Sequence, residues 1–352
     1  MSMSSEVGHI FAAPAIMSLA RHTQAPQSVK DLLAASAVRL LDSAMIIEDA
    51  GLPFAPIEES RTRIPLPSPP VLHAIRDTVA RIASDGFGPH ALSFFGMLGS
   101  VMMSLAGNSA QSRQVMRWVE SGKTGAFCMT DRGGPNASQW RSGTSGTGPI
   151  RLAIDKIWAM NAEAADFAIV VARRGNSMIM VPVVIPPEVY AGATRKASGA
   201  PFLDGQLPLG NVRLDVDADA DWFLSEGGPI SPKMFLALAR PWLIQALCAH
   251  AGWLAAHHRV EIDAATAERI AFLRLAAQNQ AAIAYFDRFS EDQAMAIKWV
   301  ANEVWSDLVV RGAVRSKADQ RDLLAFTKME GSSYRCFFEI YERNKRSRHV
   351  ER

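Results

Sequence analysis

The spacing of apolar residues predicts helices in the first third of the chain. Leu, Ile, Val and Ala recur at helical intervals in 28–52 and 70–86, and the same pattern continues through 88–120. A Pro-rich segment, 64–70, interrupts it. This part is therefore predicted to be a helical domain.

The pattern changes after residue 120. Gly, Ser, Thr and Pro are frequent in 121–149, and segments rich in Val, Ile and Met follow at 167–173 and 177–185. The intervening Arg174-Gly175-Asn176 is typical of a hairpin turn. Residues 211–217 alternate between apolar and polar, as a half-buried strand does. These features predict a small β domain.

Helical spacing returns after Gly227-Gly228-Pro229, in four amphipathic stretches at 232–258, 262–289, 291–311 and 317–329. Helices, then strands, then helices predict an α+β fold with segregated layers, and not an alternating parallel sheet. The predicted domains are an N-terminal helical domain (1–121), a middle β domain (122–228) and a C-terminal four-helix bundle (229–352).

Composition and charge narrow the possible partners. The 352 residues are 49% hydrophobic and 20% charged, with 37 basic and 35 acidic side chains, so no strong positive field favours nucleic-acid binding. No apolar run approaches the ~20 residues of a membrane span. The apolar stretch 9–20 follows Glu6 and no Lys or Arg, unlike a signal peptide. The three cysteines are far apart and match no disulfide or ligand spacing, so a cytoplasmic protein is expected.

Several short motifs do not support a function. Gly122-Lys123-Thr124 resembles the end of a phosphate-binding loop, but Arg117 occupies the position of the first glycine. The glycine-rich stretch 143–148 does not match the dinucleotide fingerprint. The histidines between 250 and 258 have no carboxylate or cysteine at ligand spacing, so no metal site is predicted.

Two segments in the middle third together resemble the signatures of the acyl-CoA dehydrogenase family. The first, 121–131, reads Ser-Gly-Lys-Thr-Gly-Ala-Phe-Cys-Met-Thr-Asp, and the second, 156–162, reads Lys-Ile-Trp-Ala-Met-Asn-Ala. In the family, a segment ending in Thr-Glu-Pro crosses the flavin edge and a Lys-x-Trp-Ile-Thr-Asn segment packs against the ring. The resemblance implies that the cofactor-binding residues of the β domain are Phe127, Met129, Thr130, Asn136, Trp158 and Met160. Taken alone, Trp158 could be a core tryptophan of a β domain, but its register with the first segment favours the flavin.

A third segment lies near the C-terminus. Arg321-Asp322 is followed after seven residues by Glu330-Gly331-Ser332-Ser333, which resembles Arg-Asp, seven residues and Glu-Gly-Thr-Ser in the family. The resemblance implies that Glu330 is the catalytic base, that Gly331 binds substrate, and that Ser332 and Ser333 contact the cofactor. By itself, Glu330 could also be an acidic residue at a helix end before a terminating glycine.

Further matches extend the resemblance to about residues 28–342. Arg240-Pro241 is similar to an Arg-Pro that contacts acyl-CoA, and 107–111 is similar to a turn ahead of the β domain, although a plain turn between helices would need no function. The chain therefore resembles a divergent, shortened member close to the short- and medium-chain enzymes. This implies FAD, an acyl-CoA or acyl-carrier-protein thioester as substrate, α,β-dehydrogenation, and a homodimer or homotetramer.

Departures from the family leave alternatives open. Asp131-Arg132 replaces Glu-Pro, Met160 replaces a Thr or Ser that donates to the flavin, and Ala237 replaces an Asp. No Arg-x-x-Phe-Gly segment occurs in 259–274, and a Gly-Gly motif has shrunk to Arg311-Gly312-Ala313. The electron acceptor could be an electron-transfer flavoprotein or oxygen. A flavin-dependent oxygenase or oxidase with the same fold, and a non-catalytic member, are the alternatives.

Overall fold

The computed structural model describes residues 62–63, 69–134, 137–146, 149–199, 202–282, 285–329, 331–333, 336 and 339–340. The predicted helix at 28–52 lies outside them, as do Asn136 and Glu330. The chain forms two compact units, one of residues 64–235 and one that contains 236–352 together with 1–63. The three predicted domains, with boundaries at 121/122 and 228/229, remain a prediction.

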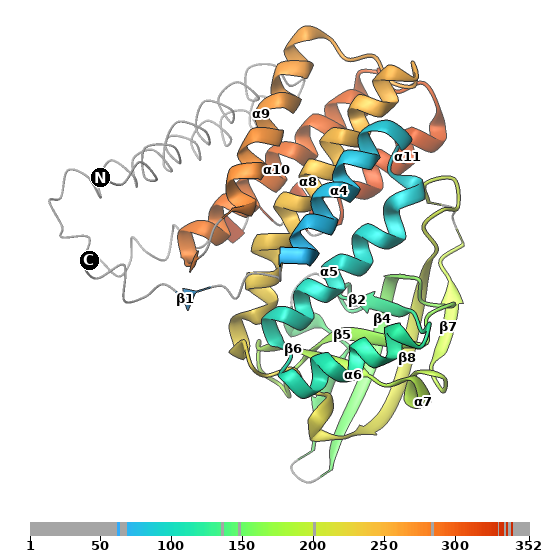
Figure 1. Ribbon diagram of the computed structural model, residues 1–352, viewed down its shortest axis with the longest axis vertical. Helices are drawn as coiled ribbons and strands as arrows, with labels where there is room; N and C mark the ends of the chain where they lie inside the picture. Colours follow the sequence, from blue (N-terminus) through green and yellow to red (C-terminus); the bar gives the residue numbers. More distant parts are fainter. Residues whose placement is uncertain are drawn as a thin grey trace, which may run out of the picture. The chain divides into compact units, whose positions relative to one another are not determined.

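The first unit begins with three helices, α4 (Pro69–Asp85), α5 (Ala91–Ala106) and α6 (Ser109–Glu120) (Figure 1). The helix predicted at 70–86 is therefore confirmed, and the pattern at 88–120 is divided between α5 and α6. The division falls at Asn108, whose side chain caps α6 while the side chain of Gln111 caps Asn108 in return. Gln111 also donates to the carbonyl oxygens of Asp221 and Phe223, at 2.7 and 3.0 Å. This turn therefore anchors α6 to the end of the β region.

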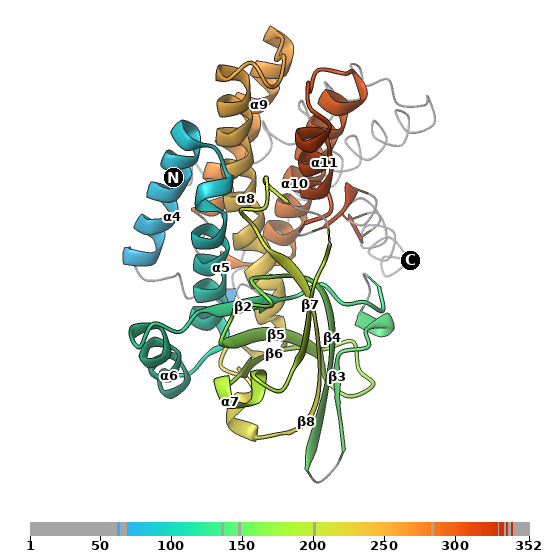
Figure 2. The same cartoon turned by 90° about the vertical axis from the view of Figure 1, so that its right-hand side faces the viewer.

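The rest of this unit is a sheet of seven strands with one short helix: β2 (Gly125–Cys128), β3 (Gly143–Ser145), β4 (Ile150–Met160), β5 (Phe167–Arg173), β6 (Met180–Ile185), α7 (Pro187–Tyr190), β7 (Thr194–Ala197) and β8 (Leu209–Ala218). The predicted hairpin is confirmed as β5 and β6, and the strand predicted at 211–217 is β8. Figure 2 shows the long strands β4 and β8, which are paired antiparallel.

The two short strands β2 and β3 both lie between β4 and β5. Each is antiparallel to β4 and parallel to β5. The row is therefore β6, β5, then β2 and β3, then β4, β8 and β7. Small and branched residues from these strands form a buried core, among them Ala126, Val170 and Leu214. The fold class is α+β, as predicted.

The C-terminal helices are α8 (Ser231–Ala256), α9 (Ala264–Ala281), α10 (Arg288–Val310) and α11 (Lys317–Phe326). A short strand β9 (Tyr285–Phe286) pairs with β1 (Thr62–Arg63). The helix predicted at 262–289 ends earlier, at Ala281, because β9 follows and Asp287 forms a capping box with Ser290 that starts α10. Ion pairs connect the helices: Arg269 contacts Asp307 at 3.1 Å, and Arg259 contacts Asp319.

Two described helical stretches, Gly88–Ala106 and Gly228–Ala256, are long and apolar enough to cross a membrane by length and composition alone. The apolar pattern of the sequence did not predict this. The most apolar window of the second stretch is entirely buried. This burial is expected of a core helix, which can meet the same length and composition criteria as a membrane-spanning helix.

Candidate functional site

The two segments of the middle third lie side by side on neighbouring strands. Phe127 of β2 is paired with Met160 of β4. Beyond the end of β2, the N–H of Ile157 donates to the carbonyl oxygen of Thr130 at 3.0 Å, and Asp131 pairs with Lys156. Thr130 therefore lies opposite the residue that precedes Trp158. The fold brings together the two segments that the sequence analysis assigned to one cofactor.

Trp158 has a backbone and an exposure that packing does not explain. The pairing of β4 with β8 shifts between Lys156 and Ala159, so two residues of β4 face one residue of β8 in a bulge. Within it Trp158 has a φ of 53°, in the left-handed region, and 53% of its surface is exposed. A non-glycine residue in this region costs roughly 1–2 kcal/mol. An exposed indole beside the exposed Thr130 fits a flat aromatic cofactor with polar groups at its edge.

A buried ion pair supports this part of the sheet. The carboxylate of Asp131 lies 3.3 Å from the ammonium of Lys156, and both side chains are fully buried. Asp131 also accepts from the N–H groups of Gly133, Arg141 and Ser142, at 2.8–3.0 Å. Lys156 donates to the carbonyl oxygen of Met129 and lies over the ring of Trp140. The pair therefore holds the connection after β2 against β4.

The ionisation of this pair follows from its surroundings. Burial opposes the charge of Asp131, but Lys156 and the hydrogen bonds keep the pKa of Asp131 below its ordinary value. Burial lowers the pKa of Lys156 to about 8, and Asp131 opposes that shift. Both groups are charged at neutral pH. Asp131, which stands where the family signature has Glu, thus has a defined structural role.

The other predicted residues of the β domain differ in exposure. Phe127 is buried, with its ring 5.0 Å from that of Phe235, and its role as a cofactor contact remains a prediction. Met129 and Met160 are half-buried. Asn136 lies outside the described residues.

The predicted C-terminal residues belong to the helical unit. Glu330 lies outside the described residues, but its neighbour Gly331 has a φ of 123°, which favours glycine. A methyl carbon added at Gly331 would lie 3.5 Å from Nη2 of Arg240 and 2.9 Å from Sγ of Cys336. Arg240, on α8, is 2% exposed. Arg240 and Gly331, predicted separately as substrate-binding residues, are therefore neighbours.

Side chains of α10 contact the same turn. Nδ2 of Asn302 donates to the carbonyl oxygen of Gly331 at 3.1 Å. Glu303 accepts hydrogen bonds from the side chains of Ser333 and Trp299, and although these lower its pKa, burial raises it above the ordinary value. Ser332 and Ser333 are half-buried, and the carbonyl oxygen of Ser332 accepts from the N–H of Cys336 at 2.9 Å.

Sequence reasoning missed Lys156, Asn302 and Glu303. A signal existed for Lys156, because it continues the inward alternation of Leu152 and Ile154 along β4, and a charge at an inward position requires a partner. Asn302 likewise lies on the buried side of α10. Their partners are far away in the sequence, so the pattern could not identify them.

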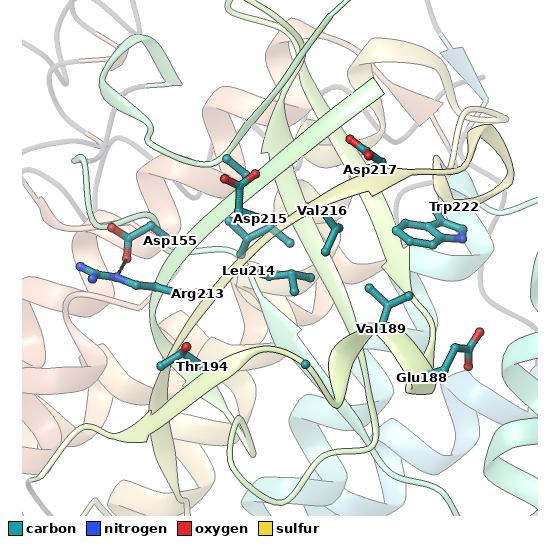
Figure 3. Close-up of a pocket in the computed structure, with 13 residues that line it drawn as sticks. Asp155, Glu188, Val189, Thr194, Arg213, Leu214, Asp215, Val216, Asp217 and Trp222 are labelled. Carbon is teal, nitrogen blue, oxygen red and sulfur yellow. Dashed lines mark hydrogen bonds and ion pairs between the residues drawn. The ribbon is translucent and has the colours of Figure 1, made fainter. Parts of the chain in front are cut away.

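An open groove of about 700 Å³ lies on the sheet, lined by β4, β8 and the region of α7 (Figure 3). It contains none of the predicted site residues. Its charged lining includes Asp155, Glu188, Asp215 and Asp217, with Arg213 bound to Asp155 at 3.2 Å. An acidic lining disfavours the phosphates of a nucleotide cofactor. Among the described residues, no group of three His, Cys, Asp or Glu could hold a metal ion.

Comparisons with known proteins identify the fold. No family model matches the chain, and no curated protein matches it in sequence. Solved structures do match. Butyryl-CoA dehydrogenase from Megasphaera elsdenii is 17% identical, with 77% of this chain and 80% of that one covered and a TM-score of 0.57.

Two oxidases match over more of the chain. A nitroalkane oxidase is 13% identical, with 97% of this chain and 95% of that one covered, and a prolyl acyl carrier protein oxidase is 11% identical, with 97% and 99% covered; both have a TM-score of 0.61. These identities are too low to transfer a reaction, but the coverage is nearly complete. The chain has the acyl-CoA dehydrogenase fold.

Proposed function

We propose that this protein is an FAD-dependent oxidoreductase that dehydrogenates an acyl thioester, carried on CoA or on a carrier protein, at its α and β carbons. The observation that carries the proposal is Trp158, exposed and left-handed beside Thr130 on the sheet of this fold. A tryptophan in an unfavourable backbone conformation that gains little from burial is best explained by a ligand that covers it. The segments around it are those that resemble the flavin-binding signatures.

The chain's own residues would hold the cofactor as follows. Trp158 offers an aromatic surface, Thr130 a hydroxyl, and Met129 and Met160 polarisable apolar contacts. By resemblance, Asn136, Ser332 and Ser333 contribute further polar contacts. When bound, the flavin supplies the acceptor for the hydride that leaves the β carbon.

Glu330 would remove the α proton of the thioester, so the carboxylate becomes a carboxylic acid while the β C–H electron pair leaves as hydride. The product is an α,β-unsaturated thioester. Arg240 lies against Gly331, the residue after Glu330, so its positive charge favours negative charge at this turn. We propose that Arg240 acts on the reacting end of the substrate. This differs from the sequence-based expectation of a contact with CoA.

A second candidate function is that of an oxidase or oxygenase, in which reduced flavin reacts with oxygen. Met160 favours it, because a thioether stands beside Phe127 at the position where the family has a hydroxyl donor to the flavin. Two oxidases with this fold also match nearly the whole chain. A non-catalytic protein is the third possibility, and a colourless purified protein would support it.

The test is the absorbance of the flavin during anaerobic addition of a panel of acyl thioesters to wild type and to Glu330→Gln. The variant should keep its flavin and bind thioester, but its flavin should bleach about 10²- to 10⁴-fold more slowly, because a positioned general base contributes that much. Glu339→Gln makes the same chemical change at a half-buried glutamate nine residues further along the chain and should bleach at the wild-type rate.

Bleaching of Glu330→Gln at the wild-type rate would remove Glu330 from the reaction. A wild type that no thioester bleaches, but that consumes oxygen once its flavin has been reduced chemically, would favour the oxidase.

A further inference from the structure

Three side chains of α10 contact described residues on both sides of position 330. Lys298 and Asn302 are one helical turn apart, and both are fully buried. Lys298 donates to the carbonyl oxygen of Phe326, the last residue of α11, at 3.1 Å. Asn302 donates to the carbonyl oxygen of Gly331, and Glu303 accepts from Ser333. The contacts therefore fall on both sides of residue 330.

Lys298 determines which way the amide of Asn302 points. The ammonium of Lys298 donates to Oδ1 of Asn302. An ammonium has only donors, so it must face the amide oxygen, and the NH₂ group is directed to the other side. That side is the carbonyl oxygen of Gly331, 3.1 Å from Nδ2. The donor to the turn is thus oriented by a charge and not by packing alone.

A buried ammonium is an expensive way to stabilise a helix pair. Apolar residues of similar volume often stabilise a core as well as buried charged groups do, or better. Lys298 and Asn302 instead satisfy one carbonyl at the end of α11 and one in the turn after it. Both contacts restrain backbone that flanks residue 330.

We propose that Asn302, oriented by Lys298, is a positioning residue: it holds the carbonyl of Gly331, the residue that follows the proposed base in the sequence. The inference rests on the proposed function, in which Glu330 is the base. Asn302 touches neither substrate nor cofactor in this role. It acts through the backbone at Gly331, whose φ of 123° favours glycine.

The test compares wild type with Asn302→Asp. The variant keeps the volume and the partner of Lys298 but removes the donor to Gly331. Hydrogen exchange of the peptide that covers residues 327–336 should become about 10-fold faster or more, while exchange in α8 and α9 stays the same. At saturating thioester, anaerobic flavin bleaching should slow about 10- to 100-fold, because a small misplacement of a catalytic group has an effect of that size. The thioester dissociation constant should stay within about 3-fold of wild type.

Two further variants keep the inference falsifiable. Lys298→Met leaves Asn302 without its orienting charge, so this variant should also show faster exchange and slower bleaching. It provides the test if Asn302→Asp does not fold. Gln280→Glu is the matched control, because Gln280 is a buried amide that donates to the carbonyl of Ser290 at 2.9 Å. It should leave exchange in 327–336 unchanged.

Unchanged exchange in this peptide in both variants would overturn the inference, and so would faster exchange with an unchanged bleaching rate. If no thioester bleaches the wild-type flavin, the proposed function fails. In that case the exchange data still decide whether Asn302 holds the turn.

Discussion

At the scale of single residues, Trp158 carries an unfavourable backbone and little compensating burial. Replacing it with glycine should relieve the left-handed strain of about 1–2 kcal/mol and remove only a partly exposed ring. We therefore expect Trp158→Gly to leave the free energy of unfolding of the flavin-free protein unchanged or higher. The same variant should bind FAD more weakly, by about 10-fold or more, because stacking area is lost.

Urea unfolding and titration with FAD measure the two effects separately. Trp158→Phe is the control, since it keeps an aromatic face and the strain, and should retain most of the affinity. A glycine variant that is clearly less stable without flavin would show that Trp158 is mainly a structural residue.

His250 predicts a dependence of stability on pH. It is buried on α8 and stacked on Trp253, and burial, with Arg259 nearby, lowers its pKa to about 4 although Asp319 opposes the shift. The unfolded chain binds this proton below about pH 6.5, while the folded protein resists it until about pH 4. The contribution of neutral His250 to the free energy of unfolding is therefore present above pH 6.5. It is lost as the pH falls toward 4, and the loss amounts to at most about 3 kcal/mol.

The glutamine side chain of His250→Gln is not protonated in this pH range. The free energy of unfolding of this variant should therefore fall less than that of wild type between about pH 7.5 and 5. Chemical unfolding at both pH values measures the difference. Equal losses in the two proteins would mean that folding does not lower the pKa of His250.

At the scale of elements, the pair Asp131–Lys156 joins the connection after β2 to β4. Removing one partner of a buried ion pair typically costs about 3–5 kcal/mol, because the other charge is left without compensation. The loss of stability caused by Lys156→Met should be at the low end of this range, since three N–H groups still donate to Asp131. Flavin affinity should fall in parallel, because Thr130 and Trp158 lie on the joined segments.

A double-mutant cycle with Asp131→Asn and Lys156→Met, followed by urea unfolding, isolates the coupling. The coupling free energy between the two side chains should exceed about 1 kcal/mol. Additive single effects would mean that each residue is held by its other contacts and that the pair itself contributes little.

At the scale of the whole molecule, the cofactor and the assembly are linked predictions. By its resemblance to acyl-CoA dehydrogenases, whose FAD site is completed across a subunit interface, we expect a homodimer or homotetramer whose flavin is lost when dilution separates the subunits. Heat release and chromatography should identify FAD and not FMN, and light scattering gives the mass at each dilution. A monomer that keeps its flavin would contradict this prediction.

Arg311 bears on the same question. The sequence 311–313 replaces a Gly-Gly motif which, by resemblance to acyl-CoA dehydrogenases, is expected to hold the far end of FAD. In this structure Arg311 is paired with Asp263 and Asp307 of the helical unit, at 2.8 and 3.0 Å. Its side chain thus already joins α9 and α10. We therefore expect an intersubunit FAD contact to use side chains other than that of Arg311.

Local pattern determined much of the architecture. The helical and alternating spacings predicted α4, the hairpin of β5 and β6, β8 and the C-terminal helices, because each element's periodicity reflects the face that it buries. The order of the three resembling segments also predicted the fold. The end of α9 was placed eight residues too late, since the apolar spacing of 262–289 does not show the short pairing of β9 with β1.

Only the tertiary structure decided which residues work together. The left-handed Trp158 arises from the pairing of β4 with β8, and the partnership of Asp131 with Lys156 from the pairing of segments far apart in the chain. Arg240, Asn302 and Gly331 come from three different parts of the sequence and meet at one turn. Spacing along the chain records which face of an element is buried. It does not record which distant group that face meets, and the charges and donors of a site depend on such meetings.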